Sequence, residues 1–247
     1  MTLTRSSSKQ LNHLELIVLA SLSGLLYSSW PLGYIFNPAA NRGLASNLGG
    51  IHQPYNWLFS LLDIVSGLLV VCVAWLLLVG KKKALSTLAS FAIYTYGGFG
   101  LLTAIDALIP EDCLADLHQC GIILRHPLVV IHGLVSLASI GCLTLSLLAM
   151  WWLVTRRHAS PAWLRWSLHV VLAIWFAFGI NTAVLLWQDK SSALSQHIFI
   201  IACSLWVGAL PYMVHRLALS SGVVVAAKTV RKNRRRLILS AKSRLGA

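Results

Sequence analysis

Charged residues are scarce in this chain, and acidic ones most of all. Only 11% of the 247 residues are charged, and only seven are Asp or Glu. A soluble domain usually carries about 25% charged residues, so a water-facing globule is not expected. Hydrophobic residues make up 57% of the sequence. A chain of this composition has too little polar surface to face water, and the lipid bilayer is its natural solvent.

The few charges are mostly positive, which gives a formal net charge of +13. Strongly basic chains often bind nucleic acid, but here the Lys and Arg residues lie at the ends of apolar runs. That arrangement orients transmembrane helices in a bilayer. We therefore expect a polytopic membrane protein in contact with the lipid bilayer, and no nucleic-acid partner.

Six apolar stretches are long enough to cross about 30 Å of hydrocarbon. They cover residues 14–36, 57–79, 84–109, 127–154, 162–187 and 196–217. Each should be a helix, because a span with open backbone groups is too costly in lipid. The sequence therefore predicts an all-α membrane helix bundle. It places one six-helix transmembrane domain in residues 1–217 and a basic tail in residues 218–247.

The linkers between these stretches differ sharply in charge. Of the 20 Lys and Arg residues, all but Arg42, Arg125 and Lys190 lie on one side, which leaves 17 there. The positive-inside rule places that side in the cytoplasm. We expect a multi-pass protein of the inner or plasma membrane with both termini cytoplasmic. The basic tail is either an orientation signal alone or a segment that binds anionic lipid.

Polar side chains inside a membrane are costly, so they are the first candidates for function. Several lie within roughly 10 Å of the outer surface, given a helical rise of about 1.5 Å per residue. The candidate ligand-binding residues are Asp63, Ser66, Asp106, His132, Ser136, Asn181 and His197. Asp63 and Ser66 share a helix face, as do His132, Ser136 and Ser139. The set predicts a polar cavity open to the extracytoplasmic side, or else interhelical hydrogen bonds that only fix packing.

The same residue types could also bind a metal. Zinc accepts both carboxylate and imidazole ligands, which makes Asp63, Asp106, His132 and His197 candidates. No pair of ligands stands at i, i+4 as in a His-Glu-x-x-His helix, so no cofactor is assigned and zinc remains an alternative.

The outer loop between the third and fourth predicted spans contains Cys113 and Cys120, seven residues apart. On the oxidising side of a membrane this pair predicts a disulfide that closes a small loop. The alternative is a metal site that adds His118 and His126 to the two thiolates.

A series of short motifs runs along the first four predicted spans. Trp57-Leu58-Phe59 leads to Asp63-Ile64-Val65-Ser66-Gly67; Asp106, Pro110-Glu111-Asp112-Cys113, a second cysteine, and His132 with Ser136 follow. This order resembles the bacterial membrane proteins catalogued as domain of unknown function 998. The resemblance covers about residues 14–215 and implies no established activity.

A more distant similarity is to the membrane hydrolases that include alkaline ceramidases. The resemblance of this chain to those hydrolases implies Ser, Asp and His side chains around zinc inside the bundle. This chain differs in its six predicted spans and in having no His pair at i, i+4 in the last one.

Three functions are therefore open. The favoured one is an integral membrane protein whose outward-facing polar cavity binds a small or lipidic ligand. The second is a zinc-assisted hydrolase of the outer leaflet, in which a metal held by His132, His197 and Asp63 or Asp106 would lower the pKa of a bound water. The third is a non-catalytic accessory subunit. The sequence does not decide whether the protein is an enzyme, but the inner half lacks a matching polar path, which argues against transport.

Overall fold

The computed structural model describes residues 13–38, 45–51, 53–81, 85–109, 127–156, 160–187 and 194–217, and helices dominate this part of the chain. The named helices are α1 (His13–Tyr27), η1 (Trp30–Leu32), α2 (Gly33–Phe36), η3 (Ala45–Gly49), α3 (Asn56–Lys81), α4 (Thr87–Asp106), α6 (Pro127–Arg156) and α7 (Ala162–Trp187). A further helix covers Leu194–Leu217. No strand occurs in the described ranges, so the all-α prediction is confirmed.

Five of these helices are long and apolar enough to cross a membrane, namely α3, α4, α6, α7 and Leu194–Leu217. The first predicted span is bent: Leu14–Tyr27 and Trp30–Phe36 meet at an angle of 41°. Pro31, which has no backbone N–H to continue an α-helix, lies in the short 3-10 turn at this bend. If the bent pair counts as one span, the described helices provide up to six.

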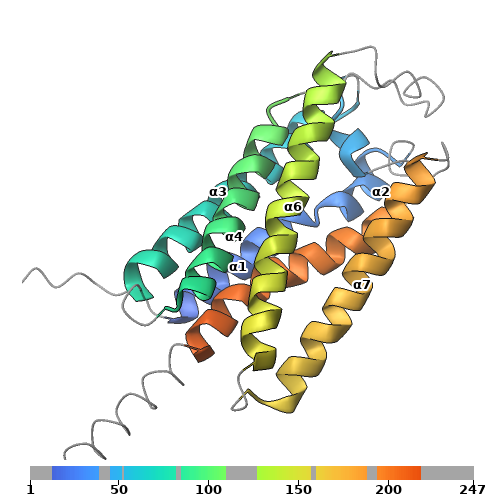
Figure 1. The fold of residues 1–247 in the computed structure, drawn as a ribbon. Coiled ribbons are helices and arrows are strands. Elements are labelled where there is room, and N and C mark those ends of the chain that lie inside the picture. Colours follow the sequence, from blue (N-terminus) through green and yellow to red (C-terminus); the bar gives the residue numbers. More distant parts are fainter. Residues whose placement is uncertain are drawn as a thin grey trace, which may run out of the picture.

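The long helices pack side by side around α4. In Figure 1, α4 lies between α3 and α6, α1 packs on α3, and α7 follows α6 on the opposite side. The helix Leu194–Leu217 contacts both α4 and α7. It meets α4 where the Tyr96 hydroxyl donates a hydrogen bond of 3.0 Å to the carbonyl of Val207. It meets α7 where the rings of Phe199 and Trp175 pack edge to face, 5.0 Å apart.

Two glycines allow α3 and α4 to approach each other closely. A Cβ atom on Gly100 would lie 2.5 Å from the carbonyl oxygen of Gly67 and 2.7 Å from the side chain of Val70. Small residues allow membrane helices to approach this closely and gain van der Waals contact. This contact fixes α3 and α4 against each other near the polar residues that both helices carry.

Two groups of buried side chains hold the bundle together. The larger joins all the long helices and includes the fully buried Tyr96, Phe99 and Trp206. The smaller is centred on Leu48 and Phe59, with Trp30 and Leu32 packed against it. Because Leu48 belongs to η3 and Phe59 to α3, the smaller group holds η3 against the beginning of α3.

Candidate functional site

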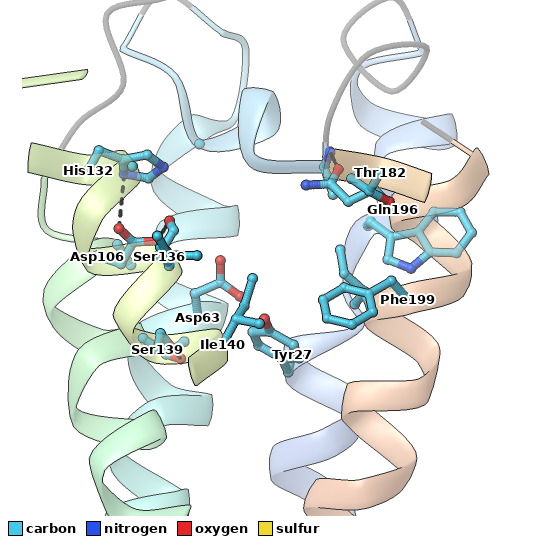
Figure 2. Close-up of a pocket in the computed structure, with 18 of the residues that line it drawn as sticks. Tyr27, Asp63, Asp106, His132, Ser136, Ser139, Ile140, Thr182, Gln196 and Phe199 are labelled. Atoms are coloured by element: carbon cyan, nitrogen blue, oxygen red, sulfur yellow. Dashed lines mark hydrogen bonds and ion pairs between the residues drawn. The ribbon is translucent and has the colours of Figure 1, made fainter. Parts of the chain in front are cut away.

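A pocket of about 610 Å³ lies at one end of the bundle (Figure 2). It lies where α1, α4 and α7 end and where α3, α6 and Leu194–Leu217 begin. Pockets for small molecules usually measure about 300–1,000 Å³. Its polar lining comprises Tyr27, Ser29, Ser60, Asp63, Thr103, Asp106, His132, Ser136, Ser139, Thr182 and Gln196.

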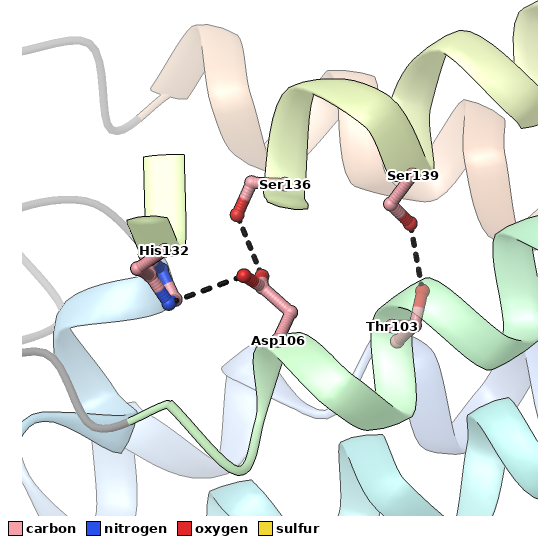
Figure 3. A network of polar contacts seen from close by, with 5 residues as sticks. All are labelled: Thr103, Asp106, His132, Ser136 and Ser139. Carbon is pink, nitrogen blue, oxygen red and sulfur yellow. Dashed lines mark hydrogen bonds and ion pairs between the residues drawn. The ribbon is translucent and has the colours of Figure 1, made fainter. Parts of the chain in front are cut away.

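Asp106, the last residue of α4, is the centre of a polar network (Figure 3). The Ser136 hydroxyl donates a hydrogen bond of 2.6 Å to Oδ2 of Asp106. Nδ1 of His132 lies 3.2 Å from Oδ1 of the same carboxylate. His132 and Ser136 are one helical turn apart on α6, so both reach the same acceptor. A hydrogen bond from a hydroxyl to a carboxylate at this distance is of the strong, charge-assisted kind.

A second polar pair continues this network deeper into the bundle. The hydroxyls of Thr103 and Ser139 are 3.0 Å apart. Thr103 precedes Asp106 by three residues and Ser139 follows Ser136 by three, so the pair extends the same faces of α4 and α6. The pocket end of the α4–α6 contact is therefore polar on an otherwise apolar interface.

Asp63 brings a second carboxylate into the pocket from α3. It lies close enough to Asp106 for the two carboxylates to repel each other. Within the described part of the chain, no hydrogen bond to the Asp63 side chain is found, and no Lys or Arg lines the pocket. An ionised carboxylate has about four acceptor positions on its two oxygens. Asp63 therefore presents free acceptor capacity to the pocket.

Four of the seven predicted site residues thus line one pocket: Asp63, Asp106, His132 and Ser136. Ser66, Asn181 and His197 are not part of its lining. The Ser66 hydroxyl donates to the carbonyl of Ser23 at 2.8 Å, which joins α3 to α1. The Asn181 amide donates to the Ser195 hydroxyl at 3.0 Å, which joins α7 to the helix Leu194–Leu217. Both contacts connect helices.

His197 does not line the pocket and does not join the carboxylates. Its ring stacks on Trp30, with the ring centroids 3.9 Å apart and the planes within 3°. The zinc set predicted from His132, His197 and the aspartates is therefore not assembled. Across the described residues, no three His, Cys, Asp or Glu side chains group in a way that could hold a metal ion.

The predicted disulfide belongs to the loop between α4 and α6. Cys113 and Cys120, with His118 and His126, lie outside the described residues. The cysteines within the described ranges, Cys72, Cys142 and Cys203, are free. The Cys113–Cys120 bond remains a prediction.

Apart from Ser139, which shares the predicted polar face of His132 and Ser136, the remaining polar lining was not predicted from the sequence as part of the site. Ser60 and Thr103 each precede a predicted carboxylate by three residues, so helical spacing would have found them. Thr182 and Gln196 stand directly beside Asn181 and His197. The sequence predicts Asn181 and His197 as site residues in their place, because it does not reveal which way each helix is rotated.

The chain is hydrophobic and has several helices long enough to span a bilayer. The protein is therefore a multi-pass integral membrane protein. The polar pocket at one end of its bundle is the feature that needs a function. The family described as "Protein of unknown function (DUF998)" matches residues 22–211, most of the chain. The protein belongs to this family, and the resemblance seen in its motifs is confirmed. No curated protein and no solved structure gives a significant match, so the similarity to alkaline ceramidases gains no support.

Proposed function

We propose that this protein binds a small amphiphilic ligand in the pocket and that the pocket opens on the extracytoplasmic side of the cell membrane. The supporting observation is the division of the pocket into two kinds of wall. Asp63 and the Asp106 network form a polar wall, whereas Ile140, Phe176 and Ile180 supply apolar surface. A ligand with a polar head and an apolar body satisfies both walls at once, because buried polar groups need partners and apolar surface does not.

The basic residues at the other end of the bundle support the proposed orientation. Lys81 ends α3, Arg156 ends α6 and Arg216 lies near the end of Leu194–Leu217, all opposite the pocket. Under the positive-inside rule these ends face the cytoplasm. In this arrangement the chain has six spans and both termini are cytoplasmic. The basic tail, residues 218–247, then meets the anionic inner leaflet.

Binding is favoured over transport because the bundle beyond the pocket is filled. The buried face of α6 continues away from the pocket as Leu143, Leu147, Met150 and Val154, all fully buried. A transporter needs a polar route through both halves of the membrane, and these side chains supply none. The ligand therefore enters and leaves from the pocket end.

A pair of glycines on α6 offers a direct test. Gly133 lines the pocket and has open space where a Cβ would lie, so Gly133→Trp should fill the pocket without displacing backbone. Gly141, two turns further along α6, also faces open space but does not line the pocket. Gly141→Trp is therefore a matched control for the effects of a bulky residue on this helix.

The measurement is native mass spectrometry of the protein purified in mild detergent. We expect the wild type and Gly141→Trp to retain one bound amphiphile per chain, and Gly133→Trp to lose it while unfolding at the same temperature. A wild type without a bound amphiphile, or equal adducts on all three proteins, would contradict the proposal.

A further inference from the structure

The short helix η3 forms part of the pocket wall at the end of the bundle. Ala45, Leu48 and Gly49 of this short helix all line the pocket. The backbone N–H of Ala45 donates a hydrogen bond of 2.5 Å to Oε1 of Gln196, at the start of the helix Leu194–Leu217. Leu48, only 1% exposed, packs against Phe59 of α3. The two contacts hold η3 as a bridge over the pocket from α3 to Leu194–Leu217.

The side of the pocket between α6 and α7 is different. Leu137 of α6 is 67% exposed, and Phe176 and Ile180 of α7 are 43% and 59% exposed, yet all three line the pocket. In Figure 1, α6 and α7 diverge toward the pocket end. Exposed apolar side chains on membrane helices face lipid chains. The pocket is therefore continuous with the lipid-facing surface at this side, and a lipid chain could lie across the opening.

The charge of the polar wall indicates which kind of ligand headgroup fits the pocket. Asp106 already receives a hydrogen bond from Ser136 and lies beside His132. Asp63 has no such partner among the described side chains, and the neighbouring Asp106 adds negative charge. Away from water, an unpaired carboxylate is costly, and its attraction to a cation is much stronger than in bulk solvent. A cationic amine supplies a positive charge that compensates the Asp63 carboxylate. It also supplies N–H groups that donate hydrogen bonds to the carboxylate oxygens.

We infer that the ligand is a membrane amphiphile with a cationic amine head, held with its amine at Asp63 and its apolar chain in the opening between α6 and α7. This inference rests on the proposed function and narrows it to one class of ligand. Among the described residues, two carboxylates and no Lys or Arg line the pocket, so this lining would repel an anionic headgroup. A neutral alcohol could donate one hydrogen bond but would leave the carboxylate charge uncompensated.

Three photoreactive probes with the same diazirine-bearing alkyl chain test this inference. One carries a primary amine head, one an alcohol and one a carboxylic acid, each added to the protein in phosphatidylcholine nanodiscs. We expect the amine probe to label peptides of α6 and α7 about tenfold more than the other two, equivalent to one charge-assisted contact. Asp63→Asn should lower amine labelling to the level of the alcohol, and Asp63→Glu should retain it.

The two glycine variants separate this inference from the proposed function. We expect Gly133→Trp to abolish labelling by the amine probe and Gly141→Trp to leave it unchanged. Equal labelling by amine and alcohol, lost together in Gly133→Trp, would overturn the amine head and leave the binding pocket standing. Stronger labelling by the acid, or amine labelling unaffected by Asp63→Asn, would also overturn it. Labelling that is the same in Gly133→Trp and the wild type for every probe would overturn both proposals.

Discussion

The hydrogen bond from Ser136 to Asp106 is a short, charge-assisted contact in the pocket wall, and its energy can be measured. In soluble proteins a hydrogen bond to a charged group contributes about 1.5–3 kcal/mol. Interhelical hydrogen bonds in a membrane average only about 0.6 kcal/mol, with a maximum near 1.7. The distance of 2.6 Å and the partial burial of Asp106, whose side chain is 20% exposed, place this pair at the upper end of the membrane range. We expect a coupling energy of about 1–2 kcal/mol.

A double-mutant cycle isolates this coupling. Ser136→Ala, Asp106→Ala and the double variant are unfolded by increasing fractions of sodium dodecyl sulfate in mixed micelles, with tryptophan fluorescence as the signal. The free energies of unfolding should be non-additive by about 1–2 kcal/mol, because the double variant loses the contact only once.

A second cycle is the control. Thr144 lies eight residues after Ser136 on α6 and accepts a hydrogen bond from Trp175. Eight residues of helix span about 12 Å, beyond the range at which substitutions usually couple. Asp106→Ala combined with Thr144→Val should therefore be additive within about 0.5 kcal/mol. A coupling near zero for Ser136 and Asp106, or equal coupling in both cycles, would refute the geometry of the polar wall.

Three further outcomes follow from the packing and the orientation. Gly100→Ala should cost about 1–3 kcal/mol in the same unfolding assay because its methyl group would overlap α3, whereas Gly80→Ala, which faces open space, should be neutral or slightly stabilising. Tyr96→Phe should cost about 0.6–1.7 kcal/mol, since it removes a buried hydrogen bond between α4 and Leu194–Leu217; an unchanged stability would mean that the bond is absent in the membrane. In intact cells, an impermeant maleimide should label a cysteine placed at Asp189 but not one placed at Lys81; labelling of both from outside would reject the proposed orientation.

Much of the fold could be predicted because a bilayer leaves few choices. Stretches of about 20 apolar residues must be helical there, so composition and length alone locate the helices. The bend at Pro31 is the exception: hydropathy shows one continuous span from residue 14 to 36, whereas the helix breaks by 41° between Tyr27 and Trp30. Hydropathy measures burial in lipid and is insensitive to a local change of backbone direction.

The candidate site could be predicted in part, because depth can be read along a helix but rotation cannot. Asp106, His132 and Ser136 lie at one depth and also face one another. Asn181 and His197 lie at the same end of the bundle, but successive residues on a helix point about 100° apart. Their immediate neighbours line the pocket in their place. Only the three-dimensional packing, with His197 stacked on Trp30, decides which of two adjacent polar residues faces inward.

The presence of an amphiphile inside the pocket is tested most directly from a side chain that bulk lipid cannot reach. Phe199 lines the pocket and is only 6% exposed, whereas Phe99 is fully buried in the core and does not line it. Each phenylalanine is replaced by p-benzoylphenylalanine, and membranes containing the variant are irradiated before the protein is purified and weighed. We expect the variant at Phe199 to gain the mass of one amphiphile and the variant at Phe99 to gain none. No adduct at Phe199, or equal adducts at both positions, would contradict a ligand-binding pocket.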